Sequence, residues 1–296
     1  MFLPNVAALD RRECLVGNLG ALIGANLKQR IAAVTMAGDF LSAFRLPGKR
    51  ALITGAGGGI GRALVRAFRA AGASVIGADL EANTMEGLEL EERLAFDLTD
   101  ARAVEKAANA LEGAGRGPDI LISNAGFTRG ETLAQIDRTV WEKEIAINLT
   151  GAFNIASPVI AAMARRGGGS IVFIASVNAI SHYGNPAYSA AKAGLVAYAK
   201  AVAVERGASG VRANVVCPGS VRTPAWDHRL EKSPDLLRRV TPHYPLGRMV
   251  TPEEVAYAAL FLASDAASGI TGAVLPVDAG LTAGNLRFVN DVIGAK

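Results

Sequence analysis

Cysteine is nearly absent from this chain of 296 residues, which contains Cys14 and Cys217 alone. Two cysteines so far apart match neither a disulfide framework nor a metal site, and no cluster of histidine, cysteine and carboxylate residues has metal-ligand spacing. A reducing compartment fits this usage better than an oxidising one. The sequence therefore predicts a cytoplasmic protein without a metal cofactor.

Long apolar runs and concentrated charge are also missing. No uninterrupted apolar run approaches the roughly 18 residues that suggest a membrane span. The formal net charge is only +4, and the basic residues are scattered, apart from short pairs such as Arg165-Arg166 and Arg238-Arg239. A nucleic-acid-binding surface usually needs a basic stripe. We therefore expect neither a membrane nor a nucleic acid as partner.

Half of the residues are hydrophobic, which is enough for a sizeable core, and short apolar runs alternate steadily with helical patterns. Such alternation is typical of a parallel sheet covered by helices on both faces. The predicted fold is α/β, a single Rossmann-type doubly wound domain with a seven-stranded parallel sheet. The strands are expected at 51–54, 74–78, 94–96, 120–123, 170–175, 211–216 and 273–277. The main helices are expected through about Ala71, through Val104 and Leu111, and at 137–163, 186–206 and 252–263.

A burst of glycine follows the first predicted strand, in the segment Thr54-Gly55-Ala56-Gly57-Gly58-Gly59-Ile60-Gly61. Glycine lets the backbone turn sharply and leaves no Cβ between the chain and a ligand. The helix that begins there points unpaired N–H groups at the same place, which suits a pyrophosphate. A plain glycine-rich connection is the alternative. The second predicted strand ends at Asp79, where an acid in a dinucleotide fold binds the ribose hydroxyls.

Tyr188 and Lys192 stand four residues apart and therefore on one face of a predicted helix. A free tyrosine has a pKa of about 10 and is a poor base at neutral pH. A nearby positive charge favours the phenolate, so we expect Lys192 to lower the pKa of Tyr188. Ser176 ends the preceding strand and can hydrogen-bond the same substrate oxygen. By itself the Tyr-x-x-x-Lys pattern also occurs on solvated helix faces.

Taken together, these motifs resemble the short-chain dehydrogenase/reductase family. The glycines follow its T-G-x-x-x-G-I-G signature, and the order of the motifs matches the family over nearly all of residues 50–284. The resemblance implies a catalytic set of Asn148, Ser176, Tyr188 and Lys192. Tyr188 would be the acid/base and Ser176 would orient the carbonyl or alcohol. Lys192 would bind the nicotinamide ribose and tune Tyr188. Asn148 would interrupt the long helix and support a proton-relay water.

The resemblance also implies the cofactor and its ligands. In the family, a preference for NADP usually shows as a basic residue before the second motif glycine or after the strand-end acid. Those positions hold Gly58 and Leu80, so NAD is the predicted cofactor. The expected cofactor-binding residues are Gly55, Gly59, Ile60, Gly61, Asp79, Asp97, Leu98, Asn124, Ala125, Gly126, Tyr188, Lys192, Pro218, Gly219, Val221 and Thr223.

The predicted activity is the NAD(H)-dependent interconversion of a secondary alcohol and a ketone on a small-molecule substrate. The alternative is a catalytically silent dinucleotide-binding sensor or scaffold, although such a protein should have lost Ser176, Tyr188 or Lys192. An epimerase or dehydratase of the extended branch would need a different glycine spacing. A sugar, a hydroxy acid, a cyclic alcohol and a 3-oxoacyl thioester all remain open as substrates.

Residues 1–46 precede the first strand, and apolar residues between 15 and 34 fall at helical spacing. Because members of the family usually begin near the position of Met36, we expect a dispensable extension or an upstream start assigned in error. The dinucleotide-binding domain would cover 47–296, with a substrate lid at about 220–247. The spacing between Ser176 and Tyr188 is one residue shorter than in many members, which is expected to reshape the loop 177–187. Family members commonly pair their two long helices across subunits, so a homotetramer or homodimer is expected.

Overall fold

The computed structural model of the chain describes residues 40–129 and 132–294. The chain divides into two units, Met1–Phe44 and Arg45–Lys296. In the first unit, the rings of Phe40 and Phe44 meet edge to face with their centroids 5.5 Å apart. Cys14 and the helical pattern expected between 15 and 34 lie outside the described residues. The fold and the site described below belong to the second unit.

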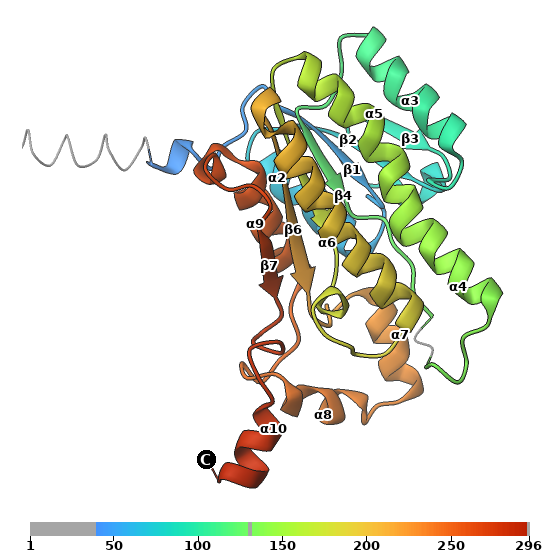
Figure 1. The fold of residues 1–296 in the computed structure, drawn as a ribbon, viewed down its shortest axis with the longest axis vertical. Coiled ribbons are helices and arrows are strands. Elements are labelled where there is room, and N and C mark those ends of the chain that lie inside the picture. The colour runs from blue at the N-terminus through green and yellow to red at the C-terminus, as the bar shows by residue number, and fades with distance from the viewer. Residues whose placement is uncertain (1–39, 130–131, 295–296) are drawn as a thin grey trace, which may run out of the picture. The chain divides into compact units, whose positions relative to one another are not determined.

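Seven parallel strands form one sheet in the order β3-β2-β1-β4-β5-β6-β7 (Figure 1). The crossover from β3 back past β1 to β4 places the switch in strand order between β1 and β4, where open α/β sheets bind ligands. In the centre of the sheet, Leu52 of β1 lies opposite Ile76 of β2 on one side and Leu121 of β4 on the other, and these pairs define the register of the three strands. The strands are β1 (Arg50–Thr54), β2 (Ser74–Asp79), β3 (Glu92–Ala95), β4 (Ile120–Ser123), β5 (Gly169–Ile174), β6 (Val211–Pro218) and β7 (Val274–Val277).

Helices cover both faces of this sheet and produce two cores. Successive strand residues point to opposite faces: Ala51 and Ile53 pack against α2 (Gly59–Ala70) and α9 (Pro252–Ala263), with Phe68 buried between them. Leu52 points the other way, into the core of α3 (Ala101–Gly113), α5 (Gly151–Arg165) and α6 (Pro186–Arg206). The predicted doubly wound, seven-stranded fold is confirmed.

The long helix expected at 137–163 is interrupted around Asn148, as the family resemblance implied. α4 (Arg138–Ile145) runs into a π-helical turn, η2 (Ala146–Thr150), before α5 begins. Hydrophobic periodicity did not reveal the extra residue of a π-turn. By length and composition the whole stretch Arg138–Arg165 could cross a membrane, with a mean hydropathy of 1.5 in its most apolar window. Its apolar face packs in the core under the sheet, which accounts for that composition.

Most element boundaries agree with the sequence prediction within two residues. β4, α6 and α9 begin and end at the predicted residues, whereas β6 continues to Pro218 and β3 begins at Glu92. The edge strand β3 alternates half-buried and exposed residues, so its apolar signal is weak. The shorter elements are η1 (Ala82–Met85), η3 (Val177–Ala179), η4 (Gly207–Ser209), α7 (Pro224–Lys232), α8 (Leu236–Val240), η5 (Thr241–His243), η6 (Asp265–Ala267), α10 (Leu286–Phe288) and η7 (Val289–Ile293).

Candidate functional site

The glycine turn between β1 and α2 brings backbone against backbone. Gly55 has a φ of +64°, a conformation that L side chains rarely adopt. A Cβ on Gly59 would lie 2.7 Å from Cβ of Thr223, and one on Gly61 would collide with the carbonyl oxygen of Gly55. The turn therefore requires glycine at these positions. It leaves the N-terminus of α2 without side chains that would block a phosphate.

A cavity of about 710 Å³ opens over this turn at the carboxyl ends of the strands. That size lies within the usual range for small-molecule and cofactor sites. A second cavity of about 190 Å³ adjoins it and shares Ile60, Asn124 and Gly126 in its wall. The predicted cofactor-binding residues in the wall of the larger cavity are Gly55, Gly59, Ile60, Gly61, Asp79, Asp97, Leu98, Asn124, Ala125, Gly126 and Thr223. Those in the wall of the smaller one include Tyr188, Lys192, Pro218, Gly219 and Val221. The glycine cradle and the paired cavities fit a nicotinamide dinucleotide.

Asp79 is tied to the glycine turn. Its carboxylate accepts a hydrogen bond from the backbone N–H of Gly57 at 2.9 Å and another from Leu80 at 2.8 Å. Close by, the guanidinium of Arg62 donates to the carbonyl oxygens of Gly57, Thr84 and Glu86. The acid therefore lines the larger cavity, while the donors of Arg62 are engaged by backbone oxygens.

The expected reactive residues Ser176, Tyr188 and Lys192 meet in the wall of the smaller cavity. Ser176 follows β5, and the other two come from the first turns of α6. Lys192 is only 3 % exposed, and its Nζ donates to the carbonyl oxygen of Ile174 at 3.0 Å while lying 5.4 Å from the centre of the Tyr188 ring. The fold therefore gathers a hydroxyl, a phenol and an ammonium group around one small space.

The ionisation of these groups differs from the sequence prediction. Burial raises the pKa of Tyr188 to about 12, a hydrogen bond with Ser176 opposes this rise, and the negative charge of Glu144 adds to it. Burial lowers the pKa of Lys192 to about 8. In the polypeptide alone the pKa of Tyr188 therefore lies above that of a free tyrosine, not below it as expected, because the loss of hydration on burial is the largest influence on it.

Asn148 lies in the π-turn, fully buried behind this wall. Its Nδ2 donates to the carbonyl oxygens of Phe127 and Glu144, and its Oδ1 accepts the N–H of Phe127. A Cβ on Gly126 would come within 2.9 Å of Asn148 Oδ1 and 3.3 Å of Lys192 Nζ, so both polar groups approach the same point of the backbone. π-turns inside helices are frequent at functional sites.

Two residues near the site were missed by the sequence analysis. Glu144 is 2 % exposed, and one of its carboxylate oxygens, Oε2, has no hydrogen-bond partner within the described part of the chain. Its position four residues before Asn148, on the same helix face, was the available signal. Asn178 hydrogen-bonds Ser176 through both its backbone and its side chain. The sequence offered no sign of that contact beyond closeness to Ser176.

No group of three or more histidine, cysteine, aspartate or glutamate residues that could hold a metal ion occurs in 40–129 or 132–294. Cys217 is a free, buried thiol at the end of β6. Burial raises its pKa to about 11, so it stays protonated at neutral pH.

Comparisons with known proteins agree with this geometry. A family model described as enoyl-(acyl carrier protein) reductase matches residues 55–282. An uncharacterized oxidoreductase of Schizosaccharomyces pombe is 42% identical over 252 residues, which cover 83% of this chain and 95% of the relative. D-threitol dehydrogenase of Mycolicibacterium smegmatis is 38% identical over 252 residues, which cover 81% of this chain and 95% of the relative.

Solved structures give the same result. An oxidoreductase of the short chain dehydrogenase/reductase family from Burkholderia thailandensis has a TM-score of 0.79 and 44% identity, and covers 85% of this chain and 99% of its own. A gluconate 5-dehydrogenase from Burkholderia cenocepacia, solved with NADP and tartrate, has a TM-score of 0.75 and 32% identity. The match covers 82% of this chain and 99% of the gluconate 5-dehydrogenase chain. This chain belongs to the short-chain dehydrogenase/reductase family of oxidoreductases.

Proposed function

We propose that this protein is an NAD(H)-dependent oxidoreductase that interconverts a secondary alcohol and a ketone. The observation that carries the proposal is the meeting of Ser176, Tyr188 and Lys192 in the wall of a small cavity that adjoins the dinucleotide-sized one. A silent sensor or scaffold would have no need to bury an ammonium group at 3 % exposure beside a phenol.

The preference for NAD over NADP is argued from charge. The carboxylate of Asp79 lines the larger cavity, and a 2′-phosphate beside it would be repelled. Arg62 is a cation beside the glycine turn that could offset this repulsion, but its guanidinium donates to three backbone carbonyl oxygens. Moving it to a phosphate would break those bonds. The gluconate 5-dehydrogenase neighbour was solved with NADP, so this preference needs its own measurement.

In the proposed mechanism, the chain binds the dinucleotide along the glycine turn and positions the substrate oxygen between Ser176 and Tyr188. The nicotinamide ring, when bound, supplies or accepts the hydride. Tyr188 donates its phenolic proton to the oxygen of a ketone, or removes the proton from an alcohol. Ser176 hydrogen-bonds the same oxygen and holds it in place. Lys192 favours the phenolate by its charge, and Asn148 lies behind it where a water could carry protons.

A screen of alcohols tests the proposal. D-threitol, gluconate, a cyclic alcohol and a 3-hydroxyacyl thioester, each incubated with NAD or NADP, represent the substrate classes left open, and D-threitol dehydrogenase and gluconate 5-dehydrogenase among the relatives support trying the first two. Reduction of NAD by at least one of them, with kcat/KM higher for NAD than for NADP, is expected. Binding of NAD without reduction by any alcohol would favour the sensor or scaffold.

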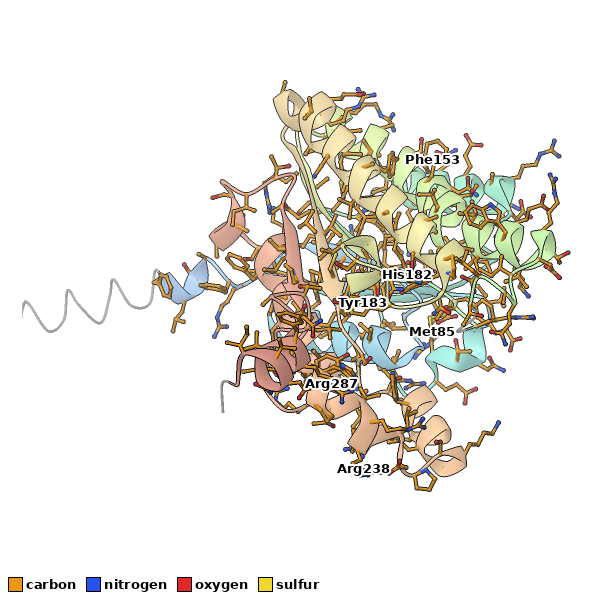
Figure 2. All side chains as sticks on the ribbon, turned by 60° about the horizontal axis from the view of Figure 1, so that its bottom comes forward. Met85, Phe153, His182, Tyr183, Arg238 and Arg287 are labelled. Atoms are coloured by element: carbon orange, nitrogen blue, oxygen red, sulfur yellow. The ribbon has the colours of Figure 1, made fainter. Side chains whose placement is uncertain are left out.

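We further propose that the protein is a homo-oligomer, most simply a tetramer. Phe153 on α5, labelled in Figure 2, is 49 % exposed. Its ring lies against that of Tyr198 of α6, with the centroids 5.7 Å apart, and Val204 further along α6 is 83 % exposed. An apolar face on two adjacent helices suits a second copy of the chain. Light scattering should give a multimer for the wild type and a smaller species for Phe153→Glu, whereas Leu133→Glu, on an exposed turn, should not change it.

A further inference from the structure

A short exposed segment, residues 127–129, follows β4 and contributes to the wall of the smaller cavity. Phe127 and Thr128 line that cavity, and both of them, like Arg129, are exposed. An exposed segment has no buried side chain of its own to keep it in place, so its position depends on hydrogen bonds made by its backbone. The acceptors and donors for these bonds come from α4 and from the π-turn that follows it.

Two buried side chains hold the segment at alternate residues. Asn148 accepts the N–H of Phe127 at 3.0 Å and donates to its carbonyl oxygen at 2.7 Å. Glu144 accepts the N–H of Arg129 through Oε1 at 3.1 Å. The two side chains stand four residues apart, a rise of about 6 Å in a helix, and two residues of chain span at most about 7 Å. One helix face can therefore hold residues 127 and 129 at the same time.

The carboxylate of Glu144 is a costly group in this position. It is 2 % exposed, and its Oε2 has no hydrogen-bond partner among the residues that the structure describes. Burying a charged group that is only partly compensated costs stability, and an apolar side chain of similar volume would avoid that cost. An apolar side chain could not accept the N–H of Arg129, however, and a charged acceptor makes such a bond about twice as strong as a neutral one. Sequences break packing rules of this kind mainly at functional sites.

The residues that line the smaller cavity divide by role. Three of them are the proposed reactive groups, and six others are among the residues expected to bind the cofactor. Of the four that remain, Ile174 and Ala175 are buried, whereas Phe127 and Thr128 are exposed. The latter two are therefore the side chains left to contact the substrate beyond its reacting carbon. Since α4 packs against α6, a bond from α4 also fixes them relative to the helix that carries Tyr188 (Figure 1).

We propose that Glu144 is a positioning residue, which holds segment 127–129 in place as the substrate-contacting wall of the smaller cavity by accepting the N–H of Arg129. This inference rests on the proposed function, in which that cavity takes the alcohol or ketone. Glu144 itself touches neither the substrate nor the reacting atoms. Because Asn148 keeps its own bonds to Phe127, loss of the carboxylate should release the far end of the segment, at Thr128 and Arg129, and leave the reactive groups in position.

Two substitutions separate the hydrogen bond of Glu144 from its charge. Glu144→Leu and Glu144→Gln both remove the charge, but the amide oxygen of glutamine can still accept the N–H of Arg129. With the alcohol of the panel that wild type oxidises best, and on the plateau of each variant's pH profile, Glu144→Leu should raise KM about tenfold while kcat changes less than about threefold, as expected when substrate binding alone is weakened. Glu144→Gln should keep KM within about twofold of wild type, because it keeps the acceptor.

The controls use the same helix and the same cofactor. Glu142→Leu, at a side chain that is 58% exposed, is the matched control and should leave KM unchanged. The Kd for NAD should stay within about twofold in every variant, because the larger cavity does not include residues 127–129 in its wall. Glu144→Ala serves as a second variant without an acceptor and should behave as Glu144→Leu does.

Hydrogen exchange of the Arg129 amide tests the same point without a substrate. Exchange should be slow in wild type and Glu144→Gln, and at least about tenfold faster in Glu144→Leu, where the acceptor is gone. Equal exchange in all three proteins would overturn the inference. An equal rise of KM in Glu144→Gln and Glu144→Leu would overturn it as well, because the charge alone would then be responsible. If wild type oxidises no alcohol, the proposed function fails instead, and the exchange rates still decide whether Glu144 holds the segment.

Discussion

Tyr188 and Lys192 are both pushed toward their neutral forms by burial, since the pKa of the phenol is raised to about 12 and that of the ammonium group is lowered to about 8. At neutral pH the polypeptide therefore holds a protonated phenol, which is ready to donate to a ketone oxygen. For alcohol oxidation the phenolate is needed. The positive charge of an oxidised nicotinamide would favour it.

Glu144 offers a way to shift this balance. Its buried negative charge raises the pKa of Tyr188, because a phenolate beside a carboxylate is repelled. Removing the charge in Glu144→Gln should therefore lower that pKa and move the rising limb of the pH profile for alcohol oxidation to lower pH. Glu142→Gln, on the same helix but 58% exposed at its side chain, should leave the profile unchanged. A shift to higher pH in Glu144→Gln would contradict the assignment.

At the residue scale, the spacing of residues in the sequence predicted some groups of the site and missed others. Ser176, Tyr188 and Lys192 stand at positions of a recognisable motif, and the structure places them in one cavity wall. Asn178 hydrogen-bonds Gly184 and Ser189, which lie 6 and 11 positions further along the chain. The loop between them has no periodic pattern that would predict these contacts. The pKa of Tyr188 depends on how deeply the folded chain buries it, which composition does not reveal.

At the scale of elements, the turn between β1 and α2 is coupled to the end of β2. Asp79→Asn keeps an oxygen that can accept the N–H of Gly57 but removes the negative charge. The ratio of kcat/KM for NAD to that for NADP should therefore fall, chiefly through a lower KM for NADP. Steady-state kinetics with both cofactors measures it. If the ratio is unchanged, Asp79 does not set the preference.

The pattern of apolar residues predicted the bounds of those elements whose burial is regular along their whole length. The strand β4 and the helix α6 were found with their bounds, since one is buried throughout and the other has a regular apolar face. The π-turn η2 was not found, because one additional residue changes the hydrogen bonding but hardly the spacing of apolar side chains. The interruption of the helix at Asn148 was therefore anticipated only through the family resemblance.

For the whole molecule, we predict that the segment before the sheet is dispensable. The division of the chain after Phe44 and the start of β1 at Arg50 motivate this expectation. A chain that begins at Met36 should keep the melting temperature, the Kd for NAD and the oligomeric state of the full chain. A large loss in any of them would show that the preceding residues contribute to the fold or to the assembly.

The substitution Tyr188→Phe tests the central claim most directly. It keeps the ring in its packing and removes only the hydroxyl that exchanges a proton with the substrate. With NAD and the best alcohol of the panel, kcat should fall by about 10²–10⁴-fold, the usual contribution of an acid–base group, while the Kd for NAD stays within about twofold. A rate within about tenfold of wild type would contradict the account.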